Sequence, residues 1–147
     1  MKETVHKLKN LIKQGKAYIS QSSDFELTQK LSPEKWSKKE ILGHLIDSGI
    51  NNLQRFTEIQ TETKPYRIRK YKQDELVKAN DYQHADLKEI TNFWIAINNR
   101  ICYVINQQTE DTLNYKIVFN SNEISDLRFL IKDYVSHLEH HLNQILK

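Results

Sequence analysis

Apolar side chains recur every three or four residues in four long stretches of the chain, and this spacing predicts four amphipathic helices. The stretches run from about Lys2 to Ser20, from Ser37 to about Thr61, from Leu87 to Val104, and from about Glu123 to the end. Their apolar positions are Val5, Leu8, Ile12 and Ile19; Ile41, Leu42, Leu45, Ile46, Leu53 and Phe56; Leu87, Ile90, Trp94, Ile97, Ile101 and Val104; and Leu127, Ile131, Tyr134, Leu138, Leu142 and Ile145. Four helices of this kind can bury their apolar faces against one another, so the pattern predicts an all-α four-helix bundle.

Polar residues mark where two of these helices begin. Ser37 and Glu40 have the spacing of a capping box, in which the hydroxyl accepts from the third helical N–H and the carboxylate reaches back. Ser121 or Asn122 is the expected cap of the fourth helix.

The segments between the helices are long, so the bundle is expected to have long crossover connections. Residues 21–36 are expected to form a linker, with a turn or a new helix start at Ser32–Pro33. Residues 62–81 contain Pro65 and are expected to cross the bundle, with a short helix at about 73–78. Residues 115–119 are expected to be extended.

Composition restricts the protein class. The 147 residues fit one domain (1–147), and 38% hydrophobic with 28% charged residues is a globular balance. A net charge of +3 is too small to imply nucleic acid. The single cysteine, Cys102, cannot form an internal disulfide, which suits a reducing cytoplasm. No apolar run has the length of a signal peptide or a membrane span, so a soluble cytoplasmic protein without a membrane partner is expected.

Histidines supply the most specific chemical signal. His137 and His141 are four residues apart in the fourth helix, so both imidazoles lie on one face, as in other helices that offer two nitrogens to one metal ion. The row through His141 continues into apolar positions, whereas the row through His140 is polar. We therefore expect His141 to face the core and His140 to face water.

A catalytic metal usually needs a third protein ligand. His44 is the best candidate, because it borders the apolar face of the second helix. A polar stripe beside an apolar face is also what an ordinary solvated helix edge looks like, so that interpretation stays open. His6 and His84 have no motif around them and are expected at the surface.

Several neighbours of His44 could assist it. Asp47 and Glu40 lie one turn to either side, and either could orient an imidazole or act as a general base, although a solvated helix face explains both. Arg55 could hold a carboxylate or phosphate of a substrate, or form a surface ion pair. Tyr134 could donate to a bound group or simply pack in the core. Trp36, Trp94 and Cys102 are expected to be packing residues.

Two motifs in this order resemble the DinB/YfiT-like superfamily. They are WSKKEILGHLIDSGINNLQRF at 36–56 and DYVSHLEHHLNQI at 133–145, and YRIRKYKQDELVKANDY at 66–82 is similar to the connecting segment of bacterial members. The resemblance implies a four-helix bundle whose metal, usually zinc or nickel, is bound by one histidine of the second helix and two of the last. Those positions are His44, His137 and His141. It also implies homodimers, and enzymes that act on small molecules as hydrolases or as transferases and isomerases using a low-molecular-weight thiol.

The first functional hypothesis is therefore a metal-dependent enzyme that carries out hydrolysis or thiol S-transfer on a small-molecule substrate. Three neutral histidines leave a divalent ion its full charge, which activates either a water or a thiol, so the ligands alone do not separate the two reactions.

Two alternatives involve no catalysis. The basic and aromatic segment 64–72 could bind nucleic acid or another polyanion, although a solvated loop is the preferred interpretation and nucleic acid is not expected. Alternatively, the metal could clamp two helices in a purely structural dimer.

Overall fold

Four helices of 20 or 21 residues form the body of the molecule, and they confirm the predicted four-helix bundle. The computed structural model describes residues 1–147. The long helices are α1 (Lys2–Gln21), α3 (Lys38–Glu58), α5 (Leu87–Asn106) and α7 (Leu127–Leu146). The capping box that starts α3 is present: the Ser37 hydroxyl accepts from the Glu40 N–H, and the Glu40 carboxylate accepts from the Ser37 N–H, each at 3.1 Å.

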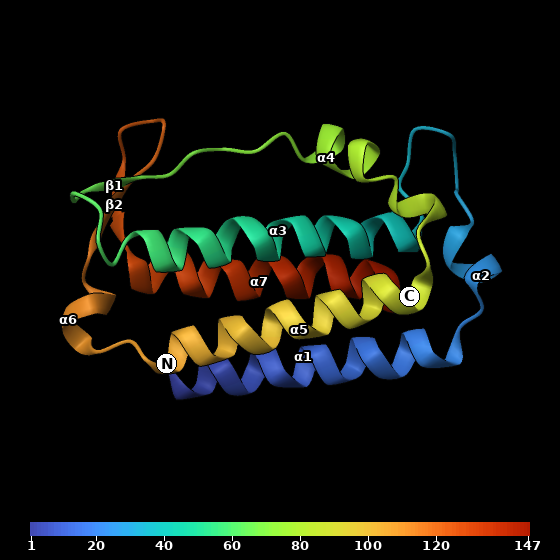
Figure 1. Ribbon diagram of the computed structural model, residues 1–147, viewed down its shortest axis with the longest axis horizontal. Helices are drawn as coiled ribbons and strands as arrows, with labels where there is room; N and C mark the ends of the chain where they lie inside the picture. The colour runs from blue at the N-terminus through green and yellow to red at the C-terminus, as the bar shows by residue number, and fades with distance from the viewer.

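The order of helix directions is up, down, down, up (Figure 1). Helices α1 and α7 run one way, and α3 and α5 run the other way. Each long helix packs mainly against two others: α3 against α5 and α7, and α1 against α5 and α7. Because α3 and α5 are parallel neighbours, the chain must return along the whole bundle between them, which explains the length of the crossover.

The crossover carries three short elements, β1 (Tyr66–Arg67), α4 (Gln73–Asn80) and a 3-10 turn at Tyr82–His84. The predicted helix at 73–78 is therefore present and two residues longer. Helix α4 packs on α3 and lies along its outer side in Figure 1. The crossover thus covers one flank of the helix that carries His44.

A small sheet lies at the end of the bundle opposite α2 (Asp24–Thr28) (Figure 1). Strand β1 pairs in parallel with β2 (Lys116–Val118), and β2 pairs antiparallel with β3 (Ile124–Asp126). Helix α6 (Glu110–Leu113) precedes β2. Strand β2 confirms the expected extended segment at 115–119.

The predicted start of the fourth helix was wrong. Residues 124–126 form β3, and α7 begins only at Leu127, with Asp126 as its cap, accepting from the Phe129 N–H at 2.9 Å. Asn122 instead occupies the turn before β3 with φ of 66°, a conformation that asparagine tolerates. The strand forms because β2 satisfies its backbone, a non-local pairing that a local helical pattern does not reveal. The second helix also ends earlier than predicted, at Glu58 rather than near Thr61.

The four apolar faces meet in one core of 30 buried residues. Trp94 is completely buried at its centre and lies directly on α1, where a Cβ at Gly15 would be 2.6 Å from the indole ring. Cys102 is buried, as predicted. None of the helices combines the length and the apolar character required to cross a bilayer.

Candidate metal centre

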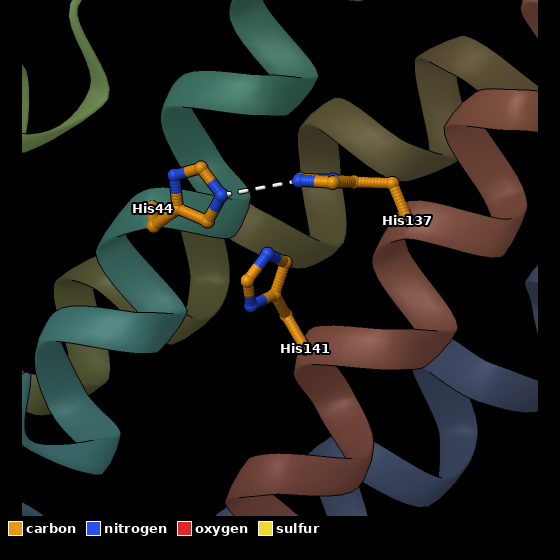
Figure 2. Close-up of side chains that lie close together, drawn as sticks. All are labelled: His44, His137 and His141. Atoms are coloured by element: carbon orange, nitrogen blue, oxygen red, sulfur yellow. Dashed lines mark hydrogen bonds between the residues drawn. The ribbon is translucent and has the colours of Figure 1, made fainter.

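Three histidines converge between the antiparallel neighbours α3 and α7 (Figure 2). His137 and His141 are one turn apart on α7, so their side chains leave the helix on the same side. His44 faces them from α3 and is completely buried, because it lies between the apolar positions Leu42, Leu45 and Ile46. The structure thus brings together all three residues that the sequence singled out.

The spacing of the imidazole nitrogens fits a metal ion. One nitrogen from each of the three rings lies within 4.8 Å of the other two. The Nε2 atoms of His44 and His137 are 3.2 Å apart. Metal–nitrogen bonds of about 2.0–2.1 Å at a tetrahedral angle place two ligand nitrogens about 3.3 Å apart. The rings therefore already have the separation that a shared cation needs, from helices that are fixed by the core.

Contacts of the outer nitrogens orient two of the rings. The Nδ1 of His141 lies 3.0 Å from Oε1 of Gln144, and because an amide oxygen only accepts, Nδ1 carries the proton and leaves Nε2 with a free lone pair. The Nδ1 of His137 lies 3.5 Å from the Ser48 hydroxyl. The Nδ1 of His44 is buried without a hydrogen-bond partner. Imidazoles that bind metals are commonly oriented in this way through their second nitrogen.

The surroundings keep two of the histidines neutral. Burial, followed by the proximity of His141 and His137, lowers the pKa of His44 to about 3. Burial and the neighbouring His141 and His140 lower the pKa of His137 to about 4. At neutral pH both rings are uncharged, which is the form that binds metal ions.

Trp36 forms one wall beside the histidines. Its ring lies 4.9 Å from that of His44, with the planes inclined by 34°. The side chain packs against the core but remains partly exposed. Trp36 was predicted to be a packing residue, and its contact with His44 was not foreseen. That contact depends on how the linker before α3 folds back.

Asp47 is 2% exposed, and its hydrogen bonds link α3 to the crossover. Its Oδ1 accepts from the Tyr82 hydroxyl at 2.6 Å and from the Asn80 amide at 3.2 Å, whereas Oδ2 has no partner. No hydrogen bond joins it to the three histidines. Burial raises the pKa of this carboxyl group, and the bond from Tyr82 opposes that effect.

The other candidates lie outside the cluster. His140 is exposed, as are His6 and His84. Tyr134 donates to the Asn98 side chain at 2.7 Å in the core. Glu40 is occupied by the capping box and by an ion pair with Lys30 at 3.1 Å.

Arg55 connects α3 to the basic segment 64–72. Its guanidinium donates to the backbone oxygen of Arg69 at 2.7 Å and lies 5.6 Å from the centre of the Tyr71 ring. Tyr66 in the same segment donates to Glu58 at 2.7 Å. Both tyrosines therefore contact α3, an arrangement that matches the preferred interpretation of segment 64–72 as a loop covering the bundle.

Comparisons with known proteins agree with this architecture. The sequence model of the DinB superfamily matches residues 13–145. A protein of Halalkalibacterium halodurans named "Putative metal-dependent hydrolase BH0277" is 24% identical over 122 residues, which are 83% of this chain and 70% of that protein. The structure of YfiT from Bacillus subtilis, described as a probable metal-dependent hydrolase with an unusual four-helix bundle topology, superposes with a TM-score of 0.87 at 22% identity, covering 99% of this chain and 83% of that one. The mycothiol-dependent maleylpyruvate isomerase superposes with a TM-score of 0.77 at 11% identity, covering 98% of this chain and 60% of that one.

Proposed function

Because this chain belongs to the DinB superfamily, we propose that it is a metal-dependent enzyme acting on a small molecule, with His44, His137 and His141 as the metal ligands. The observation that carries the proposal is the convergence of three imidazoles from two rigid helices, with two Nε2 atoms 3.2 Å apart. Three histidines leave further coordination positions for a water or a substrate, which is typical of catalytic rather than structural sites. Zinc and nickel both suit such a ligand set.

The residues of this chain would prepare the site before any substrate arrives. A divalent cation held there would supply Lewis-acid activation of a water or a thiol. His44 and His137 are neutral at pH 7 and need lose no proton on binding it. Gln144 holds His141 in the tautomer that exposes Nε2, and Trp36 shields the His44 ring from solvent on one side.

We place hydrolysis first among the reactions. The similarity to the Halalkalibacterium halodurans protein, whose name includes metal-dependent hydrolase, supports that order. Transfer of a low-molecular-weight thiol is the second candidate, supported by the fold shared with the mycothiol-dependent isomerase. We also propose that residues 1–147 act as one domain and that the protein is a cytoplasmic homodimer. We further propose that Asp47 is a positioning residue, which holds the crossover against α3 near His44 through its bonds with Tyr82 and Asn80.

Activity on a panel of esters, amides and electrophilic thiol acceptors tests the proposal. Untagged protein loaded with zinc or nickel is compared with the chelated protein, with His44→Ala and with His140→Ala. We expect turnover that needs the metal, is lost in His44→Ala and survives in His140→Ala, because His140 is exposed on the same helix as two ligands. Turnover without added thiol indicates hydrolysis, and turnover only with thiol indicates transfer. Chelated protein and His44→Ala that are as active as the metal-loaded parent would refute a role for this site.

A further inference from the structure

A cavity of about 620 Å³ opens at the end of the bundle where the linker after α2 meets the start of α3 and the end of α7. This is the end of the molecule that carries α2 and the C-terminus in Figure 1. Leu31, Trp36 and Ile41 supply apolar surface, and Lys35, Lys38 and Gln144 are among the polar lining residues. The volume suits an organic molecule of metabolite size.

Two lining residues also contact the histidine cluster. Trp36 lies against the His44 ring at 4.9 Å, and Gln144 is hydrogen-bonded to His141 at 3.0 Å. Trp36 and Gln144 therefore border both the cavity and the histidine cluster. A molecule seated in the cavity would lie beside the site where chemistry is proposed.

The cavity combines apolar walls with positive charge. Leu31 is 92% exposed, which is unusual for a leucine and leaves apolar surface that a ligand could cover. Neither Lys35 nor Lys38 has a carboxylate side chain within 4 Å. Two of the three N–H donors of the Lys38 ammonium are used by the Tyr18 hydroxyl at 2.6 Å and the main-chain oxygen of Lys147 at 2.7 Å, whereas the Lys35 ammonium donates to no protein group. Glu26 is the one acidic residue in the lining.

From this juxtaposition we propose that the cavity is the substrate pocket of the metal centre and that it takes a small organic anion with an apolar body. The apolar body lies against Trp36, Ile41 and Leu31, and the acidic group lies near Lys35 and Lys38. This inference rests on the proposed function, because it assigns the substrate class of the same site. An apolar cation is disfavoured by the two lysines, and a fully hydrophilic substrate would leave the apolar walls uncovered.

Binding of 4-phenylbutyrate, measured by NMR, tests the pocket without requiring turnover. The protein has two tryptophans, so the indole N–H of Trp36 reports on the cavity, and that of Trp94, which is completely buried, serves as an internal reference. A Trp36→Phe variant assigns the two signals. We expect a saturable shift of the Trp36 signal with a Kd on the order of 1 mM, as for a ligand of this size, and no shift of the Trp94 signal.

Neutral and charge-altered comparisons test the chemistry. The alcohol 4-phenyl-1-butanol has the same apolar body without the charge and is expected to bind more weakly. Lys35→Glu should weaken phenylbutyrate binding by about tenfold at low salt. Lys13→Glu, an exposed lysine on α1 that does not line the cavity, makes the same charge change and should leave binding unaltered. Leu31→Asp replaces apolar lining surface by a charged group and so tests the apolar wall. Because Leu31 is exposed, this substitution should leave the fold intact.

Metal content is measured on the same samples, so that a failure of the pocket proposal can be distinguished from a failure of the metal site. Normal metal content with no saturable Trp36 shift would overturn the pocket and leave the proposed function intact. Equal binding of the acid and the alcohol, or equal effects of Lys35→Glu and Lys13→Glu, would overturn the anionic substrate class. If Leu31→Asp instead converts a dimer into a monomer in sedimentation and no acid binds, the apolar surface is an interface between copies and the pocket is refuted.

Discussion

Replacing Tyr82 by phenylalanine removes a short hydrogen bond between the crossover and α3. The Tyr82 hydroxyl donates to a carboxylate that is 2% exposed, at 2.6 Å. The remaining bond to that carboxylate, from Asn80, is longer at 3.2 Å, and the second carboxylate oxygen has none. A hydrogen bond to a buried charged group contributes about 1.5–3 kcal/mol. We therefore expect Tyr82→Phe to lower the free energy of unfolding by about 2 kcal/mol at pH 7.5.

The loss should depend on pH in a definite direction. Burial raises the pKa of Asp47 above its unfolded value, so the contribution of this group to stability is fully present below the unfolded pKa and is lost as pH rises through the folded pKa. The Tyr82 bond opposes this loss, because it stabilises the charged form. Removing it raises the folded pKa further, so the effect of Tyr82→Phe should be larger at pH 7.5 than at pH 5.

Urea unfolding followed by circular dichroism, in chelator to exclude metal effects, measures these changes. Asp47→Asn supplies the matched background, because it removes the titrating group and keeps a similar shape. In that background Tyr82→Phe should cost less, and the pH dependence should be reduced. A loss below about 0.5 kcal/mol at pH 7.5, or an equal loss with aspartate and asparagine at position 47, would refute the reasoning.

Four further substitutions test the packing and the start of α7. Gly43→Ala should lower the free energy of unfolding by about 1–3 kcal/mol, because the added Cβ would overlap the Tyr82 ring; urea unfolding checks this. Gly15→Ala should also destabilise, since its Cβ would be 2.6 Å from Trp94, although alanine at an open helical site would add about 1 kcal/mol of stability; a gain in melting temperature would contradict the close contact. Asp126→Ala removes the cap of α7 and should lower the free energy of unfolding by about 1 kcal/mol in chemical unfolding, whereas Ser121→Ala should change it very little. A larger loss for Ser121→Ala than for Asp126→Ala would instead support a helix that starts near Glu123.

The helices could be predicted because their signals are local. The period of the apolar residues depends only on neighbours within a few positions, and the Ser37 box needs only Glu40. The start of α7 could not be predicted in this way. Residues 124–126 are extended because β2, which lies in a different part of the chain, pairs with them.

The contacts of the candidate site also divide into those that follow from local spacing and those that depend on distant parts of the chain. The pairing of His137 with His141 follows from helical spacing, but the approach of His44 depends on which helices become neighbours. The family resemblance, rather than the pattern, supplied that adjacency. Trp36 and Ser48 were missed as neighbours of the histidines because their contacts depend on the fold of the linker and on the packing of α3 against α7. Gln144 is three residues after His141 on α7, so helical spacing alone could have indicated that contact. The partners of Asp47 were missed because they lie on the crossover, which has little periodic signal.

Metal content tests the central claim most directly. Untagged protein is loaded with zinc or nickel, freed of excess metal and measured by elemental analysis beside His44→Ala, His141→Ala and the exposed neighbour His140→Ala. The three converging imidazoles predict about one metal ion per chain in the parent and in His140→Ala, and little in the other two variants. No retained metal in the parent, or equal retention in all four proteins, would contradict a metal centre at His44, His137 and His141.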